Sequence, residues 1–102
     1  MEAKTDSLTL EKNDVITEPP KMYSVVFWND DTTPVGYVVE LLVNVFTMKR
    51  EDAIGLTMKI DQEGNGVAGT YIRSIADSKA TIVRECNIKS HYPLKVTVEP
   101  AV

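Results

Sequence analysis

Three stretches of the chain have side-chain patterns typical of β-strands. From Lys21 to Trp28 the residues are mainly β-branched or aromatic, which favours a strand. Residues 67–71 form a second, shorter apolar stretch directly after the turn signal Gly64-Asn65-Gly66. Residues 94–99 alternate strictly between apolar and polar positions. This alternation predicts a strand with one face on a core and the other in water.

A helix is expected from residue 34 to residue 46. Apolar side chains recur there at helical spacing, at Val35, Val38, Val39, Leu42, Val45 and Phe46. The β-branched content would also suit a strand, but the length of the segment and its Thr33-Pro34 start favour a helix. Thr33 is expected to cap the first turn and Pro34 to occupy the first helical position, where a missing N–H breaks no bond.

Two further helices follow. The first is expected after Thr47, with acidic residues near its amino end, and its buried side should contain Ala53, Leu56, Thr57 and Ile60. For the second, Ser74 and Asp77 match a capping box at the start. Its buried stripe is predicted to be Ile75, Ile82, Val83 and Cys86, and its end to lie near Asn87.

The predicted order is strand, helix, helix, strand, helix, strand. Elements of these lengths make a small α+β domain, with a three-stranded antiparallel sheet and three helices packed on one face (β-α-α-β-α-β). We assign residues 21–102 to this core domain. Residues 1–20 show no sustained hydrophobic period and end in Glu18-Pro19-Pro20, so they are predicted to be a disordered N-terminal tail.

Composition narrows the possible functions. The 102-residue chain carries a formal net charge of −4, which argues against a nucleic-acid partner because such a partner needs clustered Lys and Arg. Cys86 is the single cysteine, so no internal disulfide can form and a reducing compartment is expected. No apolar run has the length of a membrane helix, and no secretory signal begins the sequence. We therefore expect a cytoplasmic protein without a membrane partner.

The candidate chemistry lies where the first strand ends. Asn29, Asp30 and Asp31 place amide and carboxylate oxygens between that strand and the Thr33-Pro34 helix start. One interpretation is a solvated turn that only caps the next helix. The other is a site for a cation. An α-ammonium has three donors and needs about three converging acceptors, which Asn and Asp oxygens supply.

The segment from Tyr23 to Val39, which contains Asn29-Asp30-Asp31 and Thr33-Pro34, resembles the signature of the ClpS family. The resemblance runs from about Pro19 to Glu99 and includes the Gly64 turn and the closing Tyr92-Pro93-Leu94 segment. It implies an adaptor, not an enzyme, that binds proteins with a bulky hydrophobic N-terminal residue, called N-degrons. Such an adaptor delivers them to a Clp-type AAA+ unfoldase, ClpA-like or ClpC-like, and the resemblance implies no cofactor.

The resemblance also implies roles for individual residues. The α-amine and first peptide unit of the degron would be held by Asn29, Asp30, Asp31, Thr33 and Asp61. Asp61 stands where the family has a histidine. The hydrophobic pocket for the first side chain would be lined by Val35, Val38, Thr57, Ile60 and Leu94. Val35 and Thr57 replace family methionines, so the pocket is expected to be roomier, stiffer and slightly more polar.

Ser74 and Lys79 correspond to positions of the family's unfoldase interface, and the tail corresponds to the extension that engages the unfoldase. A lone lysine on a helix surface is also a common solubilising feature. The chain is expected to act as a monomer. His91 is expected in an exposed loop, and one histidine with one cysteine does not make a structural zinc site.

Two alternatives stay open at the level of the sequence. Asp30, Asp31 and Asp61 would hold Mg²⁺ or Ca²⁺, or act as an acid–base pair, in a carboxylate-based enzyme, although the loop is too short for an EF-hand. An unrelated small protein-interaction domain would have the same composition. If Asp30 and Asp61 lie close together, mutual repulsion should raise the pKa of at least one above about 3.9.

Overall fold

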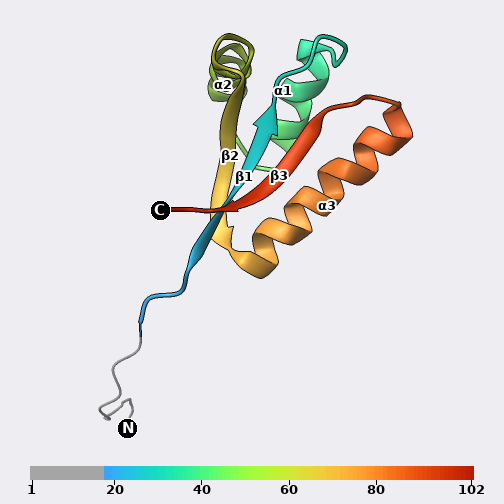
Figure 1. Ribbon diagram of the computed structural model, residues 1–102. Coiled ribbons are helices and arrows are strands. Elements are labelled where there is room, and N and C mark those ends of the chain that lie inside the picture. Colours follow the sequence, from blue (N-terminus) through green and yellow to red (C-terminus); the bar gives the residue numbers. More distant parts are fainter. Residues whose placement is uncertain (1–17) are drawn as a thin grey trace, which may run out of the picture.

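The computed structural model describes residues 18–102, and its six elements follow the predicted order (Figure 1). They are β1 (Met22–Trp28), α1 (Val35–Asn44), α2 (Arg50–Glu63), β2 (Asn65–Ile72), α3 (Arg73–Ser90) and β3 (Lys95–Pro100). The predicted fold class is confirmed. Most of the predicted tail, residues 1–17, lies outside the described residues.

The strand β1 is the centre of the sheet. The strand order is β2-β1-β3, and β1 is antiparallel to both neighbours. Val25 and Phe27 are fully buried, as expected for the strand that has a partner on each edge. At its last residue, Trp28, β1 is paired with Asn65 on one side and Lys95 on the other. The polar loop after Trp28 therefore starts from the central strand, between Asn65 of β2 and Lys95 of β3.

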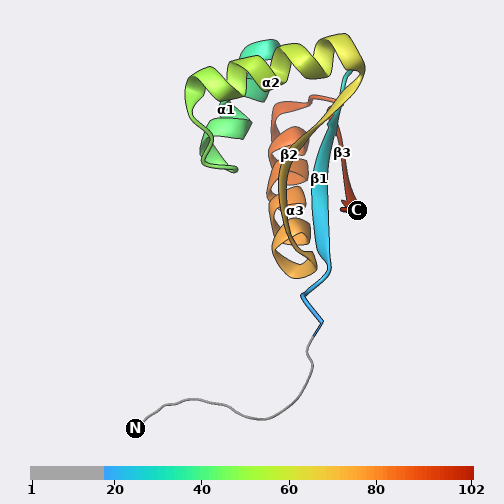
Figure 2. The same cartoon turned by 90° about the vertical axis from the view of Figure 1, so that its left-hand side faces the viewer.

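The three helices are placed differently with respect to the strands. α3 runs along the sheet and contacts all three strands, whereas α2 crosses the end at which β1 stops, and α1 packs against α2 (Figure 2). Phe27 and Phe46 meet edge to face in the core, with ring centroids 5.5 Å apart. The end of the sheet beneath α1 and α2 is therefore the place where loop, helix and strand residues converge.

The buried stripe of α3 differs from the prediction. The buried residues are Ala76, Ala80, Val83 and Asn87. Ile75 and Ile82 were predicted to be buried but are 44% and 46% exposed, and Cys86 is half-buried. The alanines follow helical spacing, and their small side chains let the helix axis approach the sheet closely. The prediction placed the isoleucines in the buried stripe because they are more hydrophobic than alanine, but their side chains are exposed.

The capping box predicted for α3 is also wrong. The helix begins at Arg73 with Ile72 as its N-cap, and no side chain caps it. Asp77 instead pairs with the Arg73 guanidinium at 3.4 Å, one helical turn away. Because β2 runs directly into α3, Ser74 already lies inside the first turn and cannot serve as the cap.

Candidate functional site

The loop after β1 is attached to the end of α2. The backbone N–H of Asn29 donates to the carbonyl oxygen of Gly64 at 2.9 Å. Gly64 ends α2 in the left-handed conformation, at φ +95°, which glycine adopts without a steric penalty. This bond brings Asn29 next to the last turn of α2, where Asp61 lies.

Asp30 is the most strongly held side chain of the loop. Its Oδ1 accepts the backbone N–H groups of Thr32 and Thr33, both at 2.8 Å, and its Oδ2 accepts the Thr33 hydroxyl at 2.8 Å. Burial alone would raise the pKa of Asp30, but the hydrogen bonds from Thr33 and Thr32 outweigh it and hold the pKa below its ordinary value of 3.8. The rise expected from a neighbouring carboxylate is not found at Asp30, which is ionised at neutral pH.

Thr33 does not cap α1. Pro34 itself is the N-cap residue, with extended backbone angles, and no side chain caps the helix. The Thr33 hydroxyl is directed to the Asp30 carboxylate instead. The predicted capping role is therefore wrong, because α1 begins at Val35 and the N-cap position belongs to Pro34, one residue after Thr33.

A cavity of about 220 Å³ opens beside this loop. It is lined by Trp28, Asn29, Asp30, Asp31, Thr33, Val35, Val38, Thr57, Ile60, Asp61 and Leu94. Every residue predicted for the α-amine site and for the hydrophobic pocket lines this one cavity, although the roles themselves stay a prediction. Trp28 is the one lining residue that the sequence reasoning missed. Its position directly before Asn29 was the available signal.

The cavity has an apolar floor and a polar rim. Val38, Thr57, Ile60 and Leu94 are buried and form the floor, whereas Val35 is 62% exposed at the opening. Asn29, Asp31 and Asp61 are exposed around the rim. Within residues 18–102, no basic residue lines the cavity. The arrangement fits a ligand that has a cationic group next to an apolar one.

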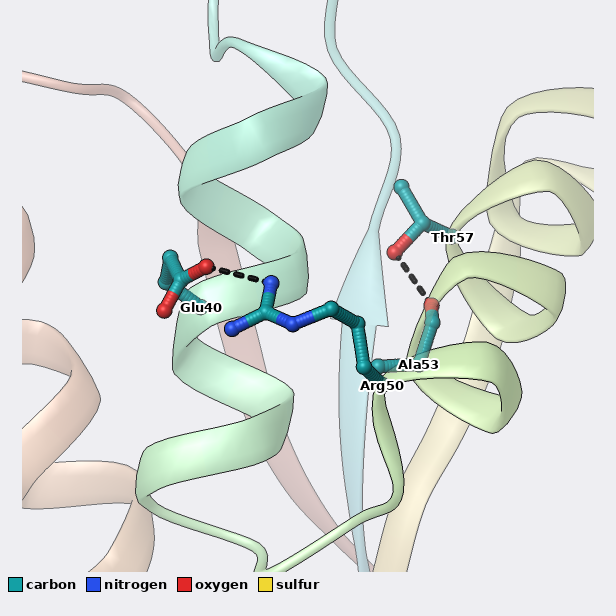
Figure 3. Close-up of polar contacts among 4 residues, drawn as sticks. All are labelled: Glu40, Arg50, Ala53 and Thr57. Atoms are coloured by element: carbon teal, nitrogen blue, oxygen red, sulfur yellow. Dashed lines mark hydrogen bonds and ion pairs between the residues drawn. The ribbon is translucent and has the colours of Figure 1, made fainter.

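Figure 3 shows two polar contacts made by α2, one at Thr57, which lines the cavity, and one at Arg50, which is not among the lining residues. The Thr57 hydroxyl donates to the Ala53 carbonyl oxygen of its own helix at 2.7 Å. Its donor is thus satisfied internally, and an apolar ligand would leave no unpaired O–H there. Arg50 bonds Glu40 at 2.6 Å across α1 and α2, and this bond lowers the pKa of Glu40. Both partners are exposed, so the pair adds little stability.

Trp28 is fixed by two polar contacts. Its indole N–H donates to the Thr97 hydroxyl of β3 at 2.8 Å. The Lys95 ammonium lies 5.2 Å from the centroid of its ring, within the range of a cation–π contact. The ring therefore presents a defined surface to the cavity.

The residues predicted for the unfoldase interface are not part of the cavity lining. Ser74 is exposed near the start of α3. Lys79 is half-buried, and its ammonium donates to the Val45 carbonyl at 2.8 Å. The same ammonium lies 5.8 Å from the ring centroid of Phe46 and 5.5 Å from that of Tyr71. Lys79 thus stabilises the carboxyl end of α1 in addition to any role at the surface.

No group of three or more His, Cys, Asp and Glu side chains within residues 18–102 is arranged to hold a metal ion. His91 is exposed and ends α3 with a positive φ of 59°. The metal-dependent alternative therefore gains no support from the described part of the chain. No helix in that part is long and apolar enough to cross a membrane.

The fold and the cavity together define a small α+β binding domain, with acceptors for a cation above an apolar floor. The profile of the family described as "ATP-dependent Clp protease adaptor protein ClpS" matches residues 18–97. The chain belongs to the ClpS family. The resemblance of the Tyr23–Val39 segment is thereby confirmed.

The relatives cover most of the chain. It is 42% identical over 94 residues to the ATP-dependent Clp protease adapter protein ClpS of Paracidovorax citrulli, which covers 92% of this chain and 77% of that protein. The ClpS of Neisseria meningitidis is 41% identical over 87 residues, covering 85% and 84% respectively. Agrobacterium tumefaciens ClpS2, solved with bound L-phenylalaninamide, superposes with a TM-score of 0.78 at 32% identity. This match covers 81% of the present chain and 100% of the solved one.

Proposed function

We propose that the cavity binds the first residue of an N-degron, its α-ammonium at the polar rim and its side chain on the apolar floor. As a member of the ClpS family, the chain is an adaptor of the Clp protease for proteins with a bulky hydrophobic N-terminal residue. The observation that carries the residue assignment is the side-by-side placement of the ionised Asp30 and the buried floor in one cavity.

The acceptor count at the rim supports this assignment. A carboxylate offers about four lone-pair sites, and Asp30 uses three of them for Thr32 and Thr33. About one remains for an ammonium donor. The other two donors of an α-ammonium then need oxygens from elsewhere on the rim, and Asn29 and Asp61 lie there. In this assignment the Asp61 carboxylate accepts one of these donors, at the position where the family has a histidine.

The ligand of the Agrobacterium relative supports the same assignment. L-phenylalaninamide combines an α-ammonium, a carboxamide and a phenyl group. These groups match the carboxylates, the Asn29 side chain and the apolar floor in turn. The floor residues Val38, Ile60 and Leu94 offer only apolar side chains, which suits a phenyl ring or a large aliphatic group.

We further propose that the adaptor works by binding alone, as a cytoplasmic monomer with a ClpA-like or ClpC-like unfoldase, and performs no catalytic step. Ser74 and Lys79 are the proposed contact residues on α3. Lys79 has the geometry of an anchor, since its stem is half-buried and its ammonium is held by Val45. A carboxylate on the partner would compete for that ammonium.

Residues 1–20 are proposed to engage the unfoldase during delivery. A chain that starts at residue 21 should then bind degron peptides with the affinity of the full chain but fail to support degradation of a degron substrate. The comparison needs peptide titration beside a degradation assay with purified unfoldase and protease. Full-rate degradation with the shortened chain would remove the tail from the mechanism.

The degron assignment is tested by isothermal titration with a Phe-initiated peptide, its N-acetylated twin and Mg²⁺. Acetylation removes the charge and donors that the rim should bind. Unmatched acceptors should weaken binding by about 1–3 kcal/mol or more, roughly fivefold to 150-fold in Kd. Equal affinity for both peptides would end the assignment, and tight Mg²⁺ binding would instead favour the metal-dependent alternative.

A further inference from the structure

Ile60 forms part of the cavity floor and leans on a glycine from the neighbouring strand. Ile60 lies in the last turn of α2 and is only 4% exposed. Gly66 is the second residue of β2 and is itself buried. A Cβ atom on Gly66 would lie 2.8 Å from Ile60 Cγ1 and 3.0 Å from Leu56 Cδ1. Carbon atoms normally keep about 3.5–4.0 Å apart, so an added methyl group would displace these side chains.

The backbone of Gly66 does not itself require glycine. Among the described glycines only Gly64 has a positive φ. Gly66 pairs with Phe27 in the β1–β2 ladder, in ordinary strand geometry. Its lack of a side chain therefore matters for space and not for conformation.

The direction in which Ile60 would be displaced follows from its neighbours. A Cβ on Gly66 would approach Ile60 from β2, and the cavity, which Ile60 lines, is the empty space next to it. A packed interior yields where space is free. A Cβ at position 66 would thus move Ile60 toward the ligand.

We infer that Gly66 is a specificity-determining residue of the degron site: by letting Ile60 rest against bare backbone, it keeps the floor deep enough for large aromatic first residues. Gly66 does not line the cavity and acts through Ile60, so it is a positioning residue. The inference rests on the proposed degron function. It predicts that the affinity for proteins whose first residue is aromatic depends on the residue at position 66.

The test is Gly66→Ala, titrated with peptides that differ only in a first residue of Trp, Phe, Leu or Val. Overpacking should weaken Trp and Phe binding about tenfold, with less than threefold change for Leu and Val. Gly55→Ala on α2 is the matched control, because a Cβ there meets nothing within 4 Å. That variant should keep the parent ranking.

A double variant separates this mechanism from general damage. With Ile60→Ala in place, the only close contact left for the added methyl group is Leu56 Cδ1, the end of a flexible side chain that is not among the residues lining the cavity, so adding Gly66→Ala should leave the ranking of the four peptides unchanged. If Gly66→Ala alone does not fold, the double variant should fold and rank the peptides as Ile60→Ala does. An unfolded double variant, or an additive loss for Trp and Phe, would overturn the inference.

Peptide binding by the unsubstituted parent chain distinguishes a failure of the degron assignment from a failure of the role proposed for Gly66. A parent chain that binds no free-amine peptide would overturn the degron assignment. A parent that binds such peptides, paired with a Gly66→Ala variant of unchanged ranking, would overturn the role of Gly66 alone.

Discussion

Asp30 and Asp61 are the same residue type on the rim of one cavity, but the fold treats them differently. Asp30 is half-buried, and Thr32 and Thr33 hold both of its oxygens. Asp61 is exposed on the last turn of α2. The first carboxylate is therefore oriented before a ligand arrives, whereas the second must be ordered by the ligand. Preorganised groups contribute more binding free energy, because their ordering is already complete.

This difference predicts that Asp30→Ala has the largest effect on binding. The substitution removes an ionised acceptor and frees the N–H groups of Thr32 and Thr33, so the loop loses its shape as well as its charge. We expect about a hundredfold weaker binding of a Phe-initiated peptide in isothermal titration.

The matched control is Asp77→Ala on α3, which removes the same charged group far along the sequence from the rim, where Asp77 pairs with Arg73. Its affinity should equal that of the parent. If Asp30→Ala binds within threefold of the parent, Asp30 is not the principal acceptor.

Asp61→Asn should have a smaller effect, about fivefold to tenfold, because an exposed carboxylate contributes a partly screened charge. Asp61→His should preserve binding at pH 8 and lose it as the pH falls through about 6.5, where the imidazole gains a proton and repels the ammonium. The two variants and the parent are compared by titration at pH 5, 7 and 8. Affinities within twofold of the parent at all three values would show that Asp61 takes no part.

The pH profile of the parent follows from the lowered pKa of Asp30. Its ionised form, and the stability that its hydrogen bonds confer, persist above the ordinary value of 3.8 and are lost only as the pH falls through the lowered folded value. On the alkaline side, the peptide α-amine deprotonates above about pH 8. The affinity for the peptide should thus stay constant between the lowered pKa of Asp30 and about pH 8. An affinity that rises when the carboxylates are protonated would contradict the charge assignment.

The smallest effect is expected on the apolar side of the cavity. Val35→Met together with Thr57→Met adds flexible side chains at the opening and on the floor. The Trp- and Ile-initiated peptides should weaken about threefold to tenfold relative to Leu, because overpacking opposes large and β-branched groups. The measurement is a ranking across Leu, Phe, Tyr, Trp and Ile. An unchanged ranking would show that these positions do not set pocket size.

The sequence predicted most of the fold because the informative residues are strongly patterned. The alternation of apolar and polar residues up to Glu99 and the β-branched residues before Trp28 each indicate directly which side chains are buried. The pattern failed on α3, where Ala76 and Ala80 make the close contact and the more hydrophobic isoleucines do not. Alanine carries too weak a hydrophobic signal to mark a buried stripe.

The site shows the same limit in another form. The polar loop was visible because Asn and Asp cluster after a strand. The capping role assigned to Thr33 failed because α1 starts later than the pattern indicated, with Pro34 as its N-cap, and the Thr33 hydroxyl donates to Asp30 instead. The contact between Gly66 and Ile60 was invisible, because a glycine in a strand gives no indication of which side chain fills the space beside it.

The backbone N–H of Asn29 donates to the Gly64 carbonyl, so the hydrogen exchange of this single amide reports on the whole site. That amide can exchange with solvent only when the loop after β1 separates from the end of α2, an event that also parts Asp30 from Asp61. Its exchange rate therefore measures the free energy of opening the cavity. A bound degron stabilises only the closed form, so the rate should fall by the factor 1 + [L]/Kd as peptide is added. The occupancy of the adaptor would then be readable from a single backbone position.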